Sequence, residues 1–336
     1  MTAVLPFADL LDVDGRVPLL VHEHAGDEFD PGDGAIHLAL DRTGALATGD
    51  LARFDLARFD LARFDLALTV AADPPAPWLG VTSNRLDARL ARLAEAVAHA
   101  PIAALLLMRV LRIGEGLPFD AALEVESLAY STLLGSAEFA RWRAASPAGA
   151  LPPEPAEPVR YERDCNTVTL TLASPATRNA MSATMRDALY AALASVVEDP
   201  GNPSLILRGE GRCFSTGGEL SEFGSARDPA AAHLVRTRRS AARLLHRLGD
   251  RAQVRLHGAC IGSGIEIAAA AARRVAAPDT IFQLPELRMG LIPGAGGTVT
   301  LARAIGRQRT AWLALSGRRI GAVRARDWGL IHDIVP

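Results

Sequence analysis

Two glutamates occupy segments where a lone carboxylate has no evident packing role. Glu266 is the only charged residue in the apolar, alanine-rich stretch 259–272, and Glu286 directly follows Pro285. A buried, unpaired carboxylate is costly or shifts its pKa until it is neutral, so a chain seldom keeps one for packing alone. Perturbed carboxylates are typical of acid/base catalysis. The two residues therefore indicate an enzyme.

Two glycine turns, at 217–218 and 262–264, carry a second signal. Gly217 and Gly218 follow an apolar-to-polar segment, and the turn 262–264 opens the stretch that carries Glu266. Such turns leave backbone N–H groups unpaired, and a helix N-terminus carries about half a positive charge. The two turns together predict an oxyanion hole for the oxygen of a thioester that is enolised or attacked at its β-carbon. Glu266, one helical turn beyond Ser263, would lie close to the same ligand.

Composition narrows the classes of protein to which this chain can belong. Its 336 residues have a net charge of -2 and a pI near 6.5, and all 36 basic residues are Arg. This balance does not favour a nucleic-acid partner. The N-terminus has no basic leader pattern and the chain has no apolar run of about 20 residues, so we expect no membrane partner and a cytoplasmic location. The three cysteines are widely spaced, which predicts neither a metal site nor a disulfide framework.

The pattern along the chain predicts an α/β protein in four parts. Residues 1–83 read as a small α/β segment with strands near 18–25, 35–40, 64–70 and 77–81, interrupted by three copies of LARFD at 51–65 that we interpret as a tandem expansion without function. Residues 84–145 read as helical, and 146–158 as a Pro-rich, semi-rigid linker. Residues 159–336 alternate strands and helices, including strands 166–172 and 204–209, a helix from Ser182, one around 233–248 and one over 261–272.

Histidines 22 and 24 lie two residues apart on the first predicted strand. They would share one face of that strand and could act as metal ligands. No third ligand is visible, so we interpret them as solvated strand histidines, and we expect no metal site.

Five motifs resemble the enoyl-CoA hydratase/isomerase (crotonase) family in order and spacing. They are SPATRNAMSATM from 174, GRCFSTGGEL from 211, LHGACIGSGIEIA from 256, FQLPELRMGLIPGAGGT from 282, and ALSGRRIGAVRARDWGLIHDIVP from 314. The resemblance covers roughly 159–336. It implies a crotonase-like spiral of ββα units that binds acyl-CoA, with departures from the usual family residues at Ser263 (for Gly), Glu219 (for Asp) and His257 (for Asn).

The same resemblance assigns roles to individual residues. It implies that Glu266 and Glu286 are the acid/base pair, with the oxyanion N–H groups at Gly218 and Ser263. The further positions that it implies near the CoA substrate are Gly217, Gly262, Arg178 and Arg109, the last of these reaching a neighbouring subunit.

The helical part also resembles a family element, but one that normally follows the core. Residues 84–143, above all GLPFDAALEVESLAYSTLLGSAEFARW from 116, resemble the family's C-terminal helical cap and trimerisation region. The resemblance therefore implies a circular permutation, or two fused incomplete copies in which 1–83 is a degenerate core half. A homo-oligomer, either a trimer or a dimer of trimers, is implied as well.

The activity that these features favour is hydration of a 2-enoyl-CoA in fatty acid metabolism. Water would add across the 2,3 double bond, without a metal or redox cofactor, and with coenzyme A present only as part of the substrate. Two alternatives stay open. One is double-bond isomerisation or another CoA-enolate reaction on the same scaffold. The other is a pseudoenzyme whose upstream half serves as an assembly module.

Overall fold

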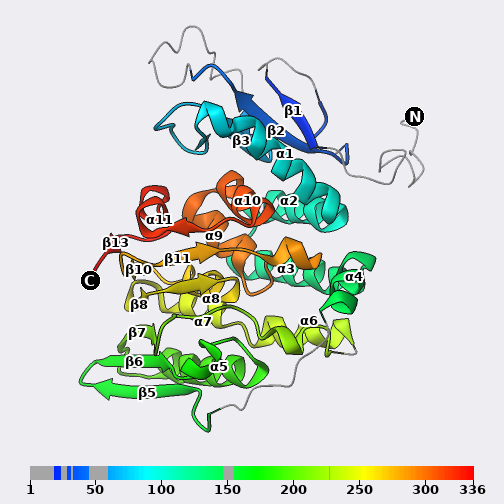
Figure 1. Cartoon of the computed structure of the whole chain (residues 1–336). Helices are drawn as coiled ribbons and strands as arrows, with labels where there is room; N and C mark the ends of the chain where they lie inside the picture. Colours follow the sequence, from blue (N-terminus) through cyan, green and yellow to red (C-terminus); the bar gives the residue numbers. More distant parts are fainter. Residues whose placement is uncertain (1–18, 24–28, 32, 45–59, 147–154, 227) are drawn as a thin grey trace.

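A computed structural model describes the chain except for residues 1–18, 24–28, 32, 45–59, 147–154 and 227. Figure 1 shows a small sheet at one end of the molecule, helices beneath it, and a larger sheet at the opposite end. One continuous set of buried apolar side chains joins these layers, with Leu38 in the small sheet, Leu107 in the helices and Leu170 in the large sheet.

The small sheet has four parallel strands in chain order. They are β1 (Leu19–His22), β2 (Ile36–Asp41), β3 (Leu66–Thr69) and β4 (Leu79–Gly80). Three of them lie within the predicted strand segments, and β2 extends one residue beyond its segment, to Asp41. Every residue of β2 and β3 is buried, as expected for central strands of a parallel sheet. Only the third LARFD copy is described: it begins with η3 (Leu61–Arg63), while positions 51–59 lie outside the described residues.

The interpretation of His22 as a solvated strand histidine was wrong. His22 is 9% exposed, and its Nε2 lies 3.0 Å from Nδ1 of His37, whose Nε2 lies 3.0 Å from Oδ1 of Asp33. The ring of Phe29 stacks on His37 with centroids 4.0 Å apart. His24 lies outside the described residues. His22 is buried because the rings of Phe29, His37 and Phe64 pack around it, whereas Leu20 and Val21 of β1 are exposed.

Asp65, the last residue of the third LARFD copy, connects the small sheet to the helices below it through Arg112. Its carboxylate accepts two hydrogen bonds from Arg112, at 2.8 and 2.6 Å. Burial raises the pKa of Asp65, although Arg112 opposes the shift. Arg307 donates to the carbonyls of Phe64 and Ala62 at 2.8 and 2.9 Å. This part of the repeat therefore has a structural role, and the interpretation of the repeat as an expansion without function stays a prediction.

Four helices follow the small sheet, as the pattern over 84–145 predicts. They are α1 (Ser83–His99), α2 (Pro101–Glu115), α3 (Phe119–Leu134) and α4 (Ala137–Ala145). Pro101 opens α2, and α1 and α2 meet at 103°. Among the described residues no single helix is long and apolar enough to cross a membrane; α1 and α2 pass that test of length and composition only as a bent pair.

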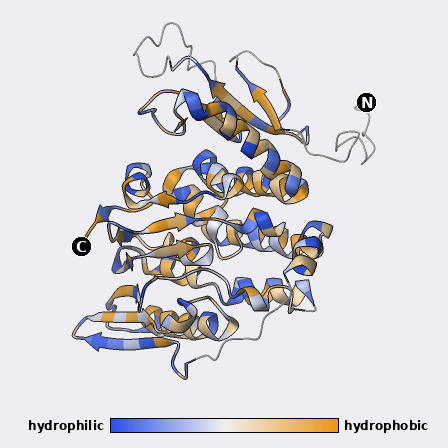
Figure 2. Ribbon diagram, in the orientation of Figure 1, coloured by the Kyte–Doolittle hydropathy of each residue, from blue (hydrophilic) through white to orange (hydrophobic). Residues whose placement is uncertain are grey.

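The large sheet has six strands, and only the pair β5 and β6 at its edge is antiparallel. A third sheet, of three strands, lies beside the large one. The six run in the order β13-β10-β8-β7-β6-β5 and the three in the order β12-β11-β9. Figure 2 shows the outer strand β5 as largely hydrophilic, in agreement with its exposed residues. The strands are β5 (Val159–Asp164), β6 (Thr167–Leu172), β7 (Ser204–Gly209), β8 (Ala252–Leu256), β9 (Ala259–Ile261), β10 (Arg273–Ala276), β11 (Ile281–Gln283), β12 (Ile320–Gly321) and β13 (Asp333–Ile334).

Helices connect and cover these strands. Ser182 caps the first of them, as expected, because its Oγ accepts a hydrogen bond from the N–H of Met185. The helices are α5 (Ala183–Glu198), α6 (Pro229–Arg238), α7 (Ala241–Leu248), α8 (Ser263–Ala268), α9 (Gly297–Ile305), α10 (Arg307–Ser316) and α11 (Ala322–Trp328). Short 3₁₀ turns are η4 (Pro175–Thr177), η5 (Leu220–Glu222), η6 (Gly249–Arg251) and η7 (Glu286–Met289).

Two predicted helix boundaries were wrong. The helix expected around 233–248 is interrupted at 239–240, where Ser240 caps α7 through the N–H of Arg243. The helix expected over 261–272 ends at Ala268, because the chain turns immediately into β10. The buried guanidinium of Arg274 caps this end of the helix: its Nη1 donates to the carbonyls of Ala271 and Ala269 at 2.5 and 3.4 Å.

Candidate active site

Two backbone segments from the predicted glycine turns lie side by side. Residues Ser215 and Cys260 form an isolated parallel bridge, and Gly217 has φ of 91°. A Cβ at Gly217 would lie 2.8 Å from the carbonyl oxygen of Ile261. The close approach of the two segments therefore requires glycine at 217 on both counts.

The predicted oxyanion donors, the N–H groups of Gly218 and Ser263, have no hydrogen-bond acceptor within the described chain. Gly218 lies opposite Met181 in an isolated parallel bridge. The N–H of Met181 donates to the carbonyl of Gly217, and the N–H of Glu219 donates to the carbonyl of Met181, so the N–H of Gly218 is not used in this bridge. Ser263 is the first residue of α8, where N–H groups have no partner within the helix. Both residues line the same cavity.

Glu266 points from α8 toward the turn that precedes α9. It is 2% exposed, and its Oε2 accepts hydrogen bonds from the N–H groups of Ala295 and Gly297 at 2.7 and 3.0 Å. The helix here is otherwise apolar because Ile265 and Ala268 face the core. The carboxylate is thus buried yet solvated by backbone donors, which favour its charged form.

Glu286 is the first residue of η7, and its carboxyl group lies near Gly262, as does that of Glu266. It is 7% exposed, and its Oε2 has no hydrogen-bond partner among the described residues. A Cβ at Gly262 would lie 2.5 Å from Oε1 of Glu286 and 3.9 Å from Oε1 of Glu266. Both carboxyl groups therefore converge on a point that only a residue without a side chain leaves open, and Gly262 has φ of 49° besides.

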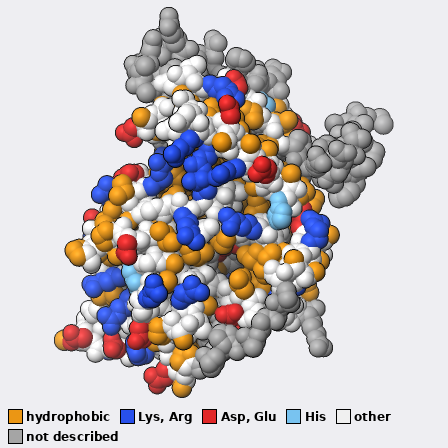
Figure 3. Space-filling model, viewed as in Figure 1, with side chains coloured by type: hydrophobic (Ala, Val, Ile, Leu, Met, Phe, Trp, Pro, Cys, Tyr) orange, Lys and Arg blue, Asp and Glu red, His pale blue; other side chains and the backbone are white. Residues whose placement is uncertain are grey.

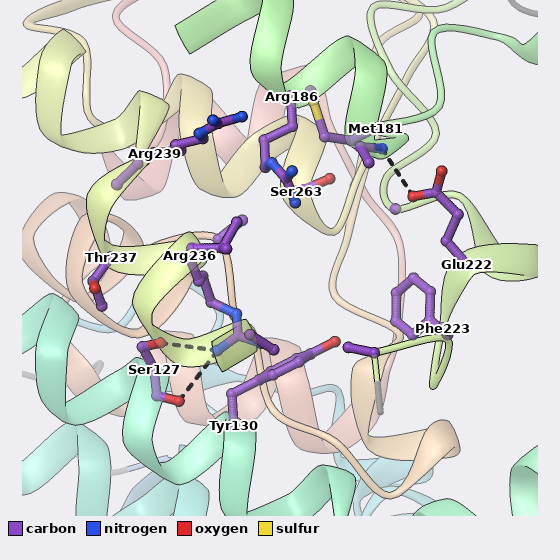
Figure 4. Close-up of a pocket in the computed structure, with 18 of the residues that line it drawn as sticks. Ser127, Tyr130, Met181, Arg186, Glu222, Phe223, Arg236, Thr237, Arg239 and Ser263 are labelled. Carbon is purple, nitrogen blue, oxygen red and sulfur yellow. Dashed lines mark hydrogen bonds between the residues drawn. The ribbon is translucent and has the colours of Figure 1, made fainter. Parts of the chain in front are cut away.

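All four predicted catalytic and oxyanion residues line one cavity of about 700 Å³. Figure 4 shows side chains from several elements around it: Tyr130, Arg236, Ser263 and Phe223 surround the space. Its wall is largely apolar, with Leu123, Leu134, Met181, Val235 and Ile267 among the lining residues. A cavity of this size fits a small-molecule substrate with an apolar portion.

A third carboxyl group, Glu126 of α3, lies in the same cavity and was missed by sequence reasoning. It is 1% exposed and accepts hydrogen bonds from the N–H groups of Gly296 and Thr298 at 2.7 and 2.8 Å, and from Oγ1 of Thr298 at 2.7 Å. Glu126 and Glu266 thus divide four consecutive N–H groups between them in alternation. The available signal was spacing: Glu126 lies three residues after Leu123 and four before Tyr130, on the apolar stripe of its helix.

We expect Glu126→Ala to lower the free energy of unfolding by about 2–4 kcal/mol, because buried N–H groups left without acceptors cost about 1–3 kcal/mol each. Glu124→Ala is the matched control on the same helix. Its half-exposed carboxylate contacts Arg243 and His233, and such surface pairs contribute about 0–1 kcal/mol. Urea unfolding measures both. Equal losses in the two variants would show that the turn at 295–298 does not depend on Glu126.

Burial shifts all three carboxyl groups toward the neutral form, and the charge of Glu126 adds to the shifts of Glu266 and Glu286. Burial raises the pKa of Glu286 to about 8 and that of Glu126 to about 7. Burial, followed by the charges of Glu286 and Glu126, raises the pKa of Glu266 well above its usual range. At neutral pH the group therefore retains protons that the unfolded chain would release, so at least one carboxyl can act as an acid.

This retention has a consequence for stability. A carboxyl whose folded pKa is raised holds its proton longer in the folded state, so its stabilising effect is present at low pH and is lost as pH rises through the folded value. We expect the free energy of unfolding to fall between about pH 5 and pH 8, and Glu286→Gln to make that fall shallower. Glu162→Gln, on the exposed strand β5, is the control and should keep the wild-type slope. Unchanged slopes in Glu286→Gln would contradict the burial of an ionisable group there.

Arg236 of α6 brings a positive charge to the cavity. Its Nη1 donates to Oγ of Ser127 and Oγ of Ser131 at 2.8 and 3.1 Å, and its guanidinium lies 4.4 Å from the centre of the Tyr130 ring. Figure 4 shows the contacts with Ser127 and Tyr130. Arg236 partly offsets the raised pKa of Glu126, but it makes no ion pair with any described carboxylate.

The remaining predicted site residues lie apart from the cavity wall. Arg178 is exposed at the end of η4, with φ of 56°, and Arg109 is on the exposed face of α2. Neither lines the cavity, whereas Gly217 and Gly262 lie directly behind its wall. The described residues contain no group of three His, Cys, Asp or Glu side chains arranged to hold a metal ion.

The part of the chain that forms most of this cavity is similar to known proteins. Residues 162–336 match the family model described as enoyl-CoA hydratase/isomerase. The chain is 36% identical over 156 residues to a probable enoyl-CoA hydratase of Bacillus subtilis, covering 46% of this chain and 60% of that protein. It is 33% identical over 167 residues to the 2,3-dehydroadipyl-CoA hydratase of Escherichia coli, covering 50% and 65%. It thus spans less than two thirds of either relative.

Among solved structures, the chain is similar to an enoyl-CoA hydratase from Thermoplasma volcanium. The TM-score is 0.49 at 29% identity, over 54% of this chain and 72% of that one.

Proposed function

Because the chain belongs to the enoyl-CoA hydratase/isomerase family, we propose that it adds water across the 2,3 double bond of a 2-enoyl-CoA thioester. One observation carries the proposal. Glu266 and Glu286 are both buried, converge on Gly262, and share a cavity with two backbone donors that have no acceptor in the described chain. Residues 159–336 form the α/β, crotonase-like part of the protein that supports this site.

The N–H groups of Gly218 and Ser263 would hold the thioester oxygen. When water attacks Cβ, negative charge moves to that oxygen, and two preorganised donors in a buried site stabilise it. They need no reorganisation, because no other group of the described chain occupies them. The step balances without a metal or redox cofactor: water gives its hydroxyl to Cβ and its proton to Glu266, Glu286 gives a proton to Cα, and proton exchange then restores both carboxyl groups.

The two glutamates would divide the proton transfers. Glu266 receives two backbone hydrogen bonds, which oppose the rise of its pKa caused by burial, and its anion would take a proton from the attacking water. Glu286 has an oxygen without a partner among the described residues and a pKa raised to about 8 by burial, which suits it to deliver a proton to Cα. The backbone hydrogen bonds of Glu266 and the unpartnered oxygen of Glu286 are the two observations that support this division of roles.

A turnover assay with crotonyl-CoA and longer 2-enoyl-CoAs tests the proposal. We expect loss of the enoyl thioester and appearance of the 3-hydroxyacyl product. Conversion of a 3-enoyl-CoA without hydration would replace this activity by double-bond isomerisation. Binding of CoA thioesters without any turnover would indicate a pseudoenzyme.

Substitutions at Ser263 separate its backbone from its side chain. Ser263→Ala should leave kcat nearly unchanged, because the proposed donor is the N–H and the buried Oγ has no partner among the described residues. Ser263→Pro removes that donor and should lower kcat by about 10²- to 10³-fold. Steady-state hydration of crotonyl-CoA measures both. A large loss in Ser263→Ala with the fold intact would mean that the hydroxyl itself takes part in the chemistry.

We further propose that the helices of residues 84–145 serve as the cap of the crotonase-like core within the same chain. Two contacts support this. Helices α2 and α3 pack against α9, and Glu126 of α3 accepts the N–H groups at the beginning of α9. The cap therefore closes the cavity on one side and supplies Glu126, Tyr130 and Leu134 to its wall.

A further inference from the structure

A second cleft, of about 950 Å³, lies between α1 and the core, and it shares no lining residue with the candidate active site. The 3₁₀ turn η7 separates the two: Glu286 lines the active site, whereas Leu287 and Arg288 line the cleft. The other walls come from α1, from α10 and from the turn after α10.

The cleft is rich in arginine. Its lining includes Arg89, Arg92, Arg288, Arg318 and Arg319. Glu95 is the one acidic residue in that lining and His99 the one histidine. Figure 3 shows a dense group of basic side chains on this face of the molecule.

These arginines are not neutralised within the described chain. None of Arg89, Arg92 and Arg318 has a described carboxylate oxygen within 4.0 Å, and Arg319 donates only to the neutral Oε1 of Gln283, at 3.2 Å. Burial, followed by the charges of Arg318 and Arg92, lowers the pKa of Arg89. Like charges held together in this way repel one another, and a bound anion would relieve that repulsion.

The backbone holds two of the arginines in place. Gly317 ends α10 with φ of 55°, and a Cβ there would lie 3.4 Å from Nε of Arg288. The guanidinium of Arg288 therefore lies against the turn that carries Arg318. The carbonyl of Arg288 is in turn 3.3 Å from Nε2 of His99 on α1. The two walls of the cleft are thus tied together beside the arginines.

The floor of the cleft is apolar. Leu93, Leu287 and Trp312 are buried there, and the ring of Trp312 meets that of Trp328 edge to face at 5.8 Å. Arginines bind phosphate oxygens through paired N–H donors, and an apolar floor accepts the uncharged part of a ligand. The volume lies at the upper end of the range of small-molecule sites and is concave, unlike the extended basic face that a nucleic acid needs.

We propose that this cleft binds a small molecule carrying two or more phosphate groups beside an apolar or aromatic part, as a nucleotide does. The phosphates lie among Arg89, Arg92 and Arg318, and the apolar part lies on Leu287 and Trp312. This binding site is independent of the proposed hydratase activity, because the two cavities have separate walls.

Calorimetric titration of the full chain tests the proposal with magnesium-free ATP, inorganic pyrophosphate and adenosine as probes. We expect ATP to bind, pyrophosphate to bind more weakly, and adenosine to bind least. The double variant Arg89→Gln/Arg318→Gln should weaken ATP binding at least about tenfold, since hydrogen bonds to charged groups are the strong ones. Arg255→Gln, on the exposed face of β8, is the matched control and should bind as the wild type does.

Two further measurements keep the test decisive. Thermal unfolding should show that ATP raises the Tm of the wild type but not of the double variant, which retains its fold because two repelling charges have been removed. Arg92→Gln, at an exposed position of α1, should weaken binding by itself. Turnover of crotonyl-CoA should be the same in the double variant and the wild type.

The proposal is overturned if wild-type protein binds none of the probes at millimolar concentration, or if the double variant binds ATP as tightly as the wild type. It is also overturned if ATP inhibits crotonyl-CoA turnover as strongly in the double variant as in the wild type, because the nucleotide would then occupy the active site. A failed hydration assay leaves this outcome untouched, and failure here leaves the hydratase proposal untouched.

Discussion

Glu286→Gln is expected to lower kcat for hydration of crotonyl-CoA by about 10²- to 10⁴-fold, the usual contribution of a positioned acid or base. The substitution keeps the shape of the side chain but removes the proton that Glu286 would deliver to Cα. Glu266→Gln should lose a similar factor, because an amide cannot take a proton from water. Its carbonyl oxygen can still accept the N–H groups of Ala295 and Gly297, so the turn should stay in place.

Binding separates catalysis from folding in these variants. Butyryl-CoA, a saturated thioester that cannot be hydrated, should bind to both variants with an affinity close to that of the wild type. Glu162→Gln on the exposed strand β5 should keep wild-type kcat. If either active-site variant retained near wild-type turnover, the glutamate in question would lose its assigned role.

A fragment of residues 155–336 is expected to be insoluble or poorly folded when produced alone. In the whole chain, α2 and α3 cover α9, and α2 also packs on α10. Removing these helices would expose the apolar surface that Leu107, Leu111 and Leu123 now cover, which is an aggregation liability. It would also leave the N–H groups of Gly296 and Thr298 without the carboxylate of Glu126.

Co-expression provides the control. Residues 80–150 supplied as a separate chain should restore solubility and part of the hydration activity, as judged by gel filtration and turnover. If 155–336 proved soluble, monomeric and fully active by itself, the upstream helices would not be the cap of this core. They would then be an independent module, and the resemblance of 116–142 to the family's C-terminal helices would need another explanation.

Sequence reasoning located those parts of the site that are encoded locally. Glu266 and Glu286 stand out because each breaks an apolar or glycine-rich pattern, and the glycine turns at 217–218 and 262–264 carry their own backbone requirement. The strands of the small sheet, and β6 and β7 of the large one, also follow from local patterns. The helix boundaries at 239–240 and Ala268 were missed although their signals are local: Ser240 caps α7, and Arg274 donates to the carbonyls just after Ala268.

The parts that were missed come from contacts across long stretches of chain. Glu126 reads as one of three acidic residues on α3, and only the docking of α3 on α9 distinguishes it from Glu124. The basic cleft arises because Arg89 and Arg318, far apart in sequence, are brought to the same space by packing of α1 on α10. Neither residue breaks a local pattern, so the sequence alone does not predict the cleft.

The alternation of Glu126 and Glu266 along the turn 295–298 bears on the order in which this protein assembles. The amides at 295 and 297 donate to Glu266, some 30 residues away in the sequence. Those at 296 and 298 donate to Glu126, on a helix about 170 residues upstream. Contacts between such distant segments form late, because the entropy of closing a long loop must be overcome first. The acid/base pair is therefore expected to reach its final setting only at the end of folding, when the upstream helices dock. Hydrogen exchange at Gly296 and Thr298 would follow that last step.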